Sequence, residues 1–148
     1  MMRGRGSEWK LAEKPTLEYL TTLGYAFIAP EKHEDLRTSL NQVLFRPHLI
    51  DAIERLNGVS RADAEAAAAE LAREEGNEEW LKLMRGDFSR QVEGQATHRT
   101  LKLIDFENPA NNQFTVTHQL YVQAEKSRIP DIVVYVNGMP AVVIEAKS

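Results

Sequence analysis

The sequence predicts a single α/β domain, in which helices pack on the faces of a β-sheet. Its first half carries apolar residues at helical spacing and an alanine-rich run over residues 61–75, a pattern typical of packed helices. Its last third carries β-branched runs separated by turn-forming residues, which predicts a succession of strands that pair antiparallel. A length of 148 residues, with 43% hydrophobic and 27% charged residues, fits one ordinary globular domain.

Composition excludes several classes of protein. The net charge is −4, so the chain has no global basic character and any contact with nucleic acid needs a local patch. The sequence has no cysteine, which excludes disulfides and thiolate zinc sites and fits a reducing compartment. No apolar stretch approaches the length of a membrane span, and the amino end has no signal-peptide core. We therefore expect a cytoplasmic protein with no membrane partner, in which residues 1–7 are a flexible lead-in.

The amino-terminal region predicts a helix, a short strand and further helix. Residues 8–24 place apolar side chains at helical spacing, and Gly24 is a typical helix end. Residues 25–28 then have the character of a short strand. Apolar spacing predicts a second helical region over residues 34–56, which Pro47 interrupts.

The middle of the chain predicts an alanine-rich helix and then the first long strands. Ser60 is positioned to cap the helix over residues 61–75. We interpret this helix as a packing element, since alanine-rich helices form on propensity alone. Residues 79–84 fit a short helical turn or a strand. Strand patterns follow over residues 100–106 and, as a half-buried strand, over residues 114–122.

The end of the chain carries the most informative pattern. Two β-branched runs flank Asn137-Gly138, which is a strong hairpin signal. Both runs are apolar on both faces, so both strands are expected in the middle of a sheet. Polar residues occur only at the end of the hairpin away from the turn, where Asp131 opens the first strand and Glu145 and Lys147 close the second. Two carboxylates and a lysine at that place are costly unless they pair or hold a metal ion.

The register of the hairpin decides whether these carboxylates can meet. With a two-residue turn at Asn137-Gly138 and regular pairing, Asp131 would face Ile144 and lie on the opposite side of the sheet from Glu145. A three-residue loop, or an equivalent one-residue bulge, would instead place Asp131 directly opposite Glu145. We therefore predict one of these two irregularities.

In the functional interpretation, Asp131 and Glu145 bind Mg²⁺ together with the backbone carbonyl of Ala146, since magnesium prefers hard oxygen ligands. The metal ion would polarise a phosphodiester and help to form hydroxide. Lys147 would orient the attacking water and neutralise charge in the transition state. The competing interpretation is a solvated Lys–Glu pair at the end of a hairpin. A site is favoured because these polar residues end two otherwise apolar strands.

Three motifs occur along the chain in a defined order. They are the helix end Leu23-Gly24-Tyr25, the run Leu103-Ile104-Asp105-Phe106-Glu107-Asn108-Pro109 followed by Asn112, Phe114 and Gln119, and the hairpin from Pro130 to Lys147. Together they resemble the amino-terminal nuclease domain of the type I restriction enzyme R subunit, the restriction and motor subunit. The resemblance covers most of residues 8–148. It implies a restriction-endonuclease-like mixed sheet flanked by helices, with its carboxy-terminal part truncated, and a PD-(D/E)XK motif on Pro130-Asp131 and Glu145-Ala146-Lys147.

The resemblance also implies a function. The family cuts double-stranded DNA with Mg²⁺ in a restriction complex that contains methyltransferase and specificity subunits. ATP-dependent translocation would belong to motor domains further along the chain, and no Gly-x-x-x-x-Gly-Lys-Ser/Thr phosphate loop occurs in this sequence. We therefore expect the chain to be the front portion of a longer protein and not necessarily active alone. Family members often carry leucine where Ala146 stands, with little expected consequence, because that position supplies only its carbonyl.

Further residues are weaker candidates. A helix carboxylate often completes the metal site in this nuclease fold, and Glu8, Glu13 and Glu18 are the candidates. Gln119 is expected near the site, whereas His118, on the opposite face, fits an ordinary strand residue. The other histidines lack partners at metal-ligand spacing, which argues against a zinc site. A set of basic residues has two equally compatible interpretations, as local contacts to phosphate or as scattered surface charge. These residues are Arg85, Arg90, Arg99, Lys102, Lys126 and Arg128.

Two other functions stay open. The chain could be a non-catalytic docking or regulatory domain of the restriction complex that keeps a vestigial site. It could also be a PD-(D/E)XK nuclease of another repair or defence system. In any of these roles, an exposed edge strand would invite self-association through residues 141–147.

Overall fold

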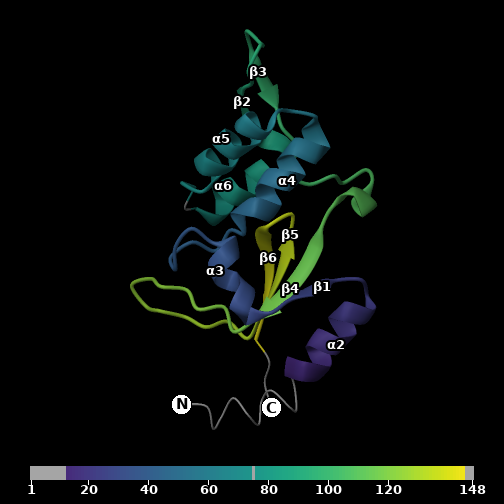
Figure 1. The fold of residues 1–148 in the computed structure, drawn as a ribbon, viewed down its shortest axis with the longest axis vertical. Helices are drawn as coiled ribbons and strands as arrows, with labels where there is room; N and C mark the ends of the chain where they lie inside the picture. The colour runs from purple at the N-terminus through teal and green to yellow at the C-terminus, as the bar shows by residue number, and fades with distance from the viewer. Residues whose placement is uncertain (1–12, 75, 146–148) are drawn as a thin grey trace.

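A computed structural model describes residues 13–74 and 76–145. At its centre lies a four-stranded mixed sheet with the strand order β1-β4-β5-β6. β1 runs parallel to β4, and the other neighbouring pairs are antiparallel. Helices flank this sheet (Figure 1), so the predicted α/β class with a mixed sheet is confirmed. The strands are Ala26–Ile28 (β1), Phe114–His118 (β4), Ile132–Val136 (β5) and Met139–Ile144 (β6).

The helices form two groups along the length of the molecule. α2 lies beside the end of the sheet away from the β5–β6 turn, whereas α4, α5 and α6 form a layer at the turn end (Figure 1). None of the helices in the described ranges combines the length and apolar character needed to cross a lipid bilayer. The helices are Lys14–Thr22 (α2), His33–Leu36 (α3), Arg46–Asn57 (α4), Arg61–Leu71 (α5) and Asn77–Lys82 (α6). Shorter elements are Pro30–Lys32 (η2), Leu83–Asp87 (η3), Pro109–Asn111 (η4) and the antiparallel pair Ser89–Gln91 (β2) and His98–Thr100 (β3).

The two faces of β5 pack into separate hydrophobic cores. On one face, Ile132 and Val134 pack with Leu17 of α2. On the other face, Val133 and Tyr135 pack against the segment that precedes α4. A third core joins α4 and α5 to the segment after β3 and to the start of β6. The all-apolar sequence of β5 is therefore explained by its central place in the sheet.

Several local predictions are confirmed. Gly24, directly after α2, has a φ of 103°, a left-handed conformation that glycine adopts without strain. The Ser60 hydroxyl accepts a hydrogen bond from the main-chain N–H of Asp63 (3.1 Å), which caps α5 as predicted. α5 ends at Leu71, before the predicted end. Its packing role is clear from the complete burial of one of its faces: Ala64, Ala67, Ala68 and Leu71.

The second helical region differs from the prediction. Residues 34–56 contribute to two separate helices, and Pro47 lies in the first turn of α4 instead of interrupting a helix. Proline is tolerated there because an N–H in the first turn has no partner within the helix. The intervening segment is tied down by Arg37, whose Nη1 donates to the main-chain carbonyls of Gln42 (3.1 Å) and Tyr121 (2.8 Å).

The strand predicted over residues 100–106 is wrong beyond Thr100, the last residue of β3. Burial still alternates along the segment, because Leu101, Leu103 and Asp105 are buried. No strand of the two described sheets pairs with it. Alternating burial therefore indicates that one side of an extended segment is covered, and it does not indicate that a strand is hydrogen-bonded beside it. Residues 79–84 take the helical option, as parts of α6 and η3.

Two strands of the main sheet differ from the prediction in their exposure. β4, predicted as half-buried, is buried on both faces over residues 115–118. Val116 packs in the core with Leu17, and on the other face the Thr117 hydroxyl lies 2.7 Å from Nε2 of His33. β6, predicted in the middle of a sheet, is the outer strand of the described sheet, and Val142 and Val143 are 50% and 55% exposed. Apolar composition alone does not distinguish a central strand from an edge strand.

Candidate functional site

The β5–β6 hairpin contains the predicted irregularity. Val136 pairs with Met139, so Asn137 and Gly138 form a two-residue turn. The register then shifts: Tyr135 faces Pro140, but Val134 faces Val142. Ala141 is thus the extra residue of a one-residue bulge. Of the two irregularities predicted from the sequence, the structure has the bulge and not the three-residue loop.

The bulge sets the positions of the predicted carboxylates. Beyond it, β5 and β6 pair regularly as far as Ile132 and Ile144. The next positions in this register are Asp131, which is half-buried, and Glu145, which is exposed. Without the bulge, Asp131 would lie opposite Ile144 instead. Ala146 and Lys147, the other two members of the predicted site, lie outside the described residues.

The end of β4 adds a third polar position. His118, the last residue of β4, pairs with Ile132, so Gln119 directly follows the strand at the level of Asp131. Gln119 has a φ of 53°, and a non-glycine residue in this region is uncommon and costs conformational energy. His118 is buried, and its ring centroid lies 5.6 Å from that of Phe27.

Of the helix carboxylates, Glu13 is placed best. It immediately precedes α2 and is only 1% exposed. It lies one helical turn before Leu17, which packs with Ile132 near the polar end of β5. Glu18 is exposed, and Glu8 lies outside the described residues. Within residues 13–74 and 76–145, no group of three or more His, Cys, Asp or Glu side chains is arranged to hold a metal ion.

The opposite end of the hairpin is held by buried hydrogen bonds. The Asn137 side-chain amide donates to the carbonyl of Leu103 (2.8 Å) and to Oδ1 of Asn112 (2.9 Å), and its Oδ1 accepts from the N–H of Gln113 (2.8 Å). Gly138 approaches α4 so closely that a Cβ would lie 2.7 Å from the Leu49 nitrogen. The turn is thereby fixed against two segments, which leaves the register of the strands below it little freedom to slip.

The Asp105 carboxylate organises the loop that contacts this turn. Its Oδ1 accepts from the main-chain N–H groups of Glu107 (3.1 Å) and Asn108 (3.0 Å), and its Oδ2 accepts from the Asn111 side-chain amide (2.9 Å). The N–H of Asn108 and then the amide of Asn111 are the main causes that lower the pKa of Asp105. The run from Leu103, which contributes strongly to the resemblance, therefore stabilises the turn and lies away from the paired carboxylates.

Some of the basic candidates have structural partners. Arg90 forms an ion pair with Glu70 (3.3 Å), and the Arg99 guanidinium donates to the carbonyl of Asn57 (2.6 Å). The main chain of Arg128 pairs with Val122 in an isolated bridge. Arg85, Lys102 and Lys126 are exposed.

Two polar features had no signal in the sequence. His33 is buried, with its Nε2 2.7 Å from the hydroxyl of Thr117, a residue 84 positions further along the chain. Trp80 lines a cavity beside the start of β6. Both depend on contacts between distant segments, which local spacing does not reveal.

Relatives of this sequence are restriction enzyme subunits. It is 29% identical over 152 residues to the type I restriction enzyme HindI endonuclease subunit of Haemophilus influenzae, with 92% of this chain and 14% of that protein covered. It is 27% identical over 158 residues to the putative type I restriction enzyme MjaIXP endonuclease subunit of Methanocaldococcus jannaschii, with 93% and 15% covered. The chain thus spans about one seventh of the length of these relatives. The family model for the type I restriction enzyme R protein N terminus matches residues 6–148, and the chain belongs to that family.

Proposed function

We propose that this domain is the Mg²⁺-dependent nuclease module of a type I restriction complex and that it cleaves double-stranded DNA. The observation that supports this most directly is the bulge in β6, because it brings Asp131 into register with Glu145. Bulges are over-represented next to active sites, where they re-aim side chains.

The donor set fits a hard divalent cation. Asp131 and Glu145 offer carboxylate oxygens, and the following residue, Ala146, offers a main-chain carbonyl, which are ligands of the type that Mg²⁺ prefers. When bound, the metal ion would supply Lewis-acid activation of the phosphodiester and of a water molecule. Two carboxylates close together are stabilised in their charged forms by a cation between them.

The remaining residues have supporting roles in this proposal. Lys147 is two positions after Glu145 in the sequence, a spacing that would place both side chains on one face if the chain continued extended. Its ammonium group would hold the attacking water and neutralise charge on the phosphate in the transition state. Glu13, buried at the start of α2, is the best-placed helix carboxylate to support the site from the neighbouring face. Gln119 would contact the substrate or the attacking water beside Asp131.

Other properties of the relatives enter as part of the proposal. The names of two of them identify endonuclease subunits of type I restriction enzymes. By that relationship, this domain would work in the cytoplasm within an assembly that includes methyltransferase and specificity subunits. ATP-driven movement along DNA would be performed by other regions of the full-length subunit.

The test is DNA cleavage by the full-length R subunit assembled with its partner subunits, in Mg²⁺ and ATP. We expect Asp131→Asn to lower the cleavage rate by about a hundredfold or more, with ATP hydrolysis unchanged. Glu34→Gln, which removes an exposed carboxylate on α3, is the matched control and should cut normally. Cleavage by the Asp131→Asn complex at the wild-type rate would refute the nuclease assignment.

Metal binding by the 148-residue chain separates this proposal from a docking role. Calorimetric titration with Mn²⁺, a readily measured substitute for Mg²⁺, should give a saturable signal in the wild-type chain and none in Asp131→Ala. Equal signals in the two proteins would favour a regulatory domain with a vestigial site.

A further inference from the structure

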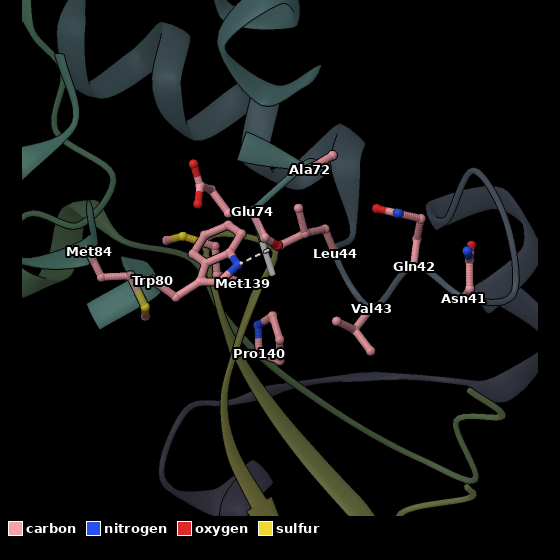
Figure 2. A pocket seen from close by; sticks show the side chains of 10 residues that line it. All are labelled: Asn41, Gln42, Val43, Leu44, Ala72, Glu74, Trp80, Met84, Met139 and Pro140. Carbon is pink, nitrogen blue, oxygen red and sulfur yellow. Dashed lines mark hydrogen bonds between the residues drawn. The ribbon is translucent and has the colours of Figure 1, made fainter. Parts of the chain in front are cut away.

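A cavity of about 410 Å³ lies at the turn end of the main sheet, away from the paired carboxylates. Its walls come from the loop before α4, the end of α5, α6 and the start of β6. Figure 2 shows the Trp80 ring close to Met84 and Met139 on one side of the lining, with the side-chain amides of Asn41 and Gln42 on the other. Its volume is within the range of about 300–1,000 Å³ that is typical of ligand pockets.

The lining has a definite chemical character. Trp80 donates its indole N–H to the main-chain carbonyl of Glu74 (3.2 Å), so a ligand would meet the face of the ring and not its donor. This hydrogen bond also brings Glu74 alongside the indole (Figure 2). Glu74 is the only charged residue among the described residues that line the cavity. An aromatic face beside one carboxylate attracts a cation and repels an anion.

The rest of the cavity suits an apolar stem. Met84 and Met139 are unbranched and polarisable, and such side chains adapt to the shape of what they contact. Leu44, which is 5% exposed, continues this apolar wall, and Met139 is fully buried. Met84 is the partly exposed member of this wall, and the stem of a long side chain with a charged head could pack against it.

The wall formed by the loop before α4 is held in place by hydrogen bonds. The loop that carries Gln42 is fixed by Arg37, which donates to the Gln42 carbonyl (3.1 Å). The other end of this loop is joined to the hairpin turn, since the Phe45 N–H donates to the carbonyl of Gly138 (2.9 Å). A rigid pocket loses little conformational entropy when it is filled.

From this chemistry we propose that the cavity is a docking site for an arginine side chain presented by a partner protein. The guanidinium stacks on Trp80 and donates to the Glu74 carboxylate, while the aliphatic stem lies on Met84, which is partly exposed. Arginine fits better than lysine because its planar, weakly hydrated head both stacks on an aromatic ring and donates to a carboxylate. Glu78, in the first turn of α6, adds negative charge to this part of the surface, whereas Glu79 is paired with Lys82 (3.6 Å). The anionic backbone of DNA is repelled from the same surface.

This docking site is independent of the nuclease proposal. It uses none of the carboxylates at the far end of the hairpin, so loss of cleavage in Asp131→Asn says nothing about it. Its lining does include Pro140, the β6 residue that faces Tyr135 at the bulge. A ligand in the cavity would therefore contact the residue at which the register of the two strands changes.

The test uses two capped tripeptides, acetyl-Leu-Arg-Leu-amide and its citrulline counterpart, which keeps the shape of arginine but has no charge. Binding to the ¹⁵N-labelled 148-residue chain is followed by NMR through the Trp80 indole N–H and the amides of the lining residues, up to about 10 mM peptide. We expect the arginine peptide to shift these signals with saturation and to bind about tenfold more tightly than the citrulline peptide.

Variants then separate the cavity from general charge attraction. Glu74→Gln, at an exposed side chain, should weaken binding of the arginine peptide about threefold to fivefold. It should leave binding of the citrulline peptide unchanged. Glu125→Gln removes the same charge from a distant exposed position and should change the affinity of neither peptide. The proposal is overturned if no lining signal shifts, if both peptides bind equally, if Glu125→Gln has the same effect as Glu74→Gln, or if a DNA duplex shifts the same signals.

Discussion

Three asparagine side chains make the hydrogen bonds that a neighbouring strand would otherwise make to the segment that follows β3. Asn57 donates to the carbonyl of Lys102 (2.9 Å) and accepts from its N–H (2.7 Å), as a paired strand residue would. Asn137 continues the row by donating to the carbonyl of Leu103 (2.8 Å). Asn112 closes it by accepting from the N–H of Asp105 (2.8 Å) and donating to its carbonyl (2.9 Å). Buried main-chain groups need such partners, which explains why this segment can be buried without joining a sheet.

A buried histidine has an equally specific environment. The Thr117 hydroxyl donates to the carbonyl of Ile28 (2.6 Å), so it can only accept from Nε2 of His33 (2.7 Å). Nε2 of His33 is therefore the nitrogen that carries a proton in this arrangement. Burial, followed by the nearby charges of Arg37 and His118, lowers its pKa from 6.5 to about 4.

We predict from this shift that the fold becomes less stable as the pH falls from about 6.5 towards 4. Between these values the unfolded chain binds a proton at His33 that the folded chain does not, so acidification favours unfolding. The stabilisation is fully present above pH 6.5 and is lost through that window. Urea denaturation at several pH values should show a smaller dependence in His33→Gln than in the wild type. An NMR titration that places the pKa of His33 near its ordinary 6.5 would contradict the prediction.

At the scale of elements, the hairpin joins a tight turn to a bulge within a few residues. Asn137 and Gly138 have φ values of 51° and 79°, both in the left-handed region that such two-residue turns require. Pro140 is two residues after Gly138. Proline has no N–H to donate and is tolerated in edge strands and at bulges. The turn fixes the start of β6, and the bulge then shifts every residue below it by one position.

Gly138 is expected to be the most sensitive position of this hairpin. Gly138→Ala would both strain a positive φ and place a methyl group against the Phe45 carbonyl and the Leu49 nitrogen. Gly94→Ala is the matched control, because Gly94 has a φ of 81° but open space around it. We expect Gly94→Ala to lower the free energy of unfolding by about 1 kcal/mol, and Gly138→Ala by about 1–3 kcal/mol more. Equal losses, measured by chemical denaturation, would mean that the close approach contributes nothing.

Elements were predictable from the sequence where local chemistry determines them. The Ser60 cap, the helix end at Gly24 and the turn at Asn137-Gly138 depend on neighbouring residues, and all are present. The strand expected over residues 100–106 failed because its partners are side chains from distant positions. The prediction at Pro47 is wrong because a proline inside a helix and one that begins a helix look alike until the start of the helix is known.

At the scale of the whole molecule, the sheet separates two regions of different chemistry. One end of the β5–β6 hairpin carries the paired positions of Asp131 and Glu145, with α2 beside it. The other end carries the turn and the cavity of Trp80, enclosed in part by α6. A partner could therefore occupy the cavity without covering the carboxylates.

The candidate site was only partly predictable at this scale. The alternation rule required a three-residue loop or a one-residue bulge if Asp131 and Glu145 were to meet, and the structure has the bulge. The burial of Glu13 could not be read from the chain, because it depends on how α2 lies across the sheet. The edge position of β6 was also inaccessible, since its sequence is as apolar as that of the central β5.

The exposed edge leads to a prediction about association. β6 has no further strand beside it among the described residues, and Val142 is 50% exposed. Unpaired main-chain groups next to apolar side chains favour pairing with a second copy of the chain. We expect the 148-residue chain to self-associate with increasing concentration, and Val142→Lys to raise the dissociation constant by about tenfold or more, since lysine on an edge strand opposes pairing.

The control for this prediction removes an equally exposed apolar side chain elsewhere. Leu23, at the end of α2, is 58% exposed and far from the edge of β6 in sequence, so Leu23→Lys tests whether general hydrophobic contact is responsible. Sedimentation velocity over a concentration series should show weakened association for Val142→Lys and wild-type behaviour for Leu23→Lys. Both variants should unfold within about 0.5 kcal/mol of the wild type, since both sites are exposed. A wild-type chain that stays monomeric at every concentration, or two variants that behave alike, would show that the edge of β6 does not pair with itself.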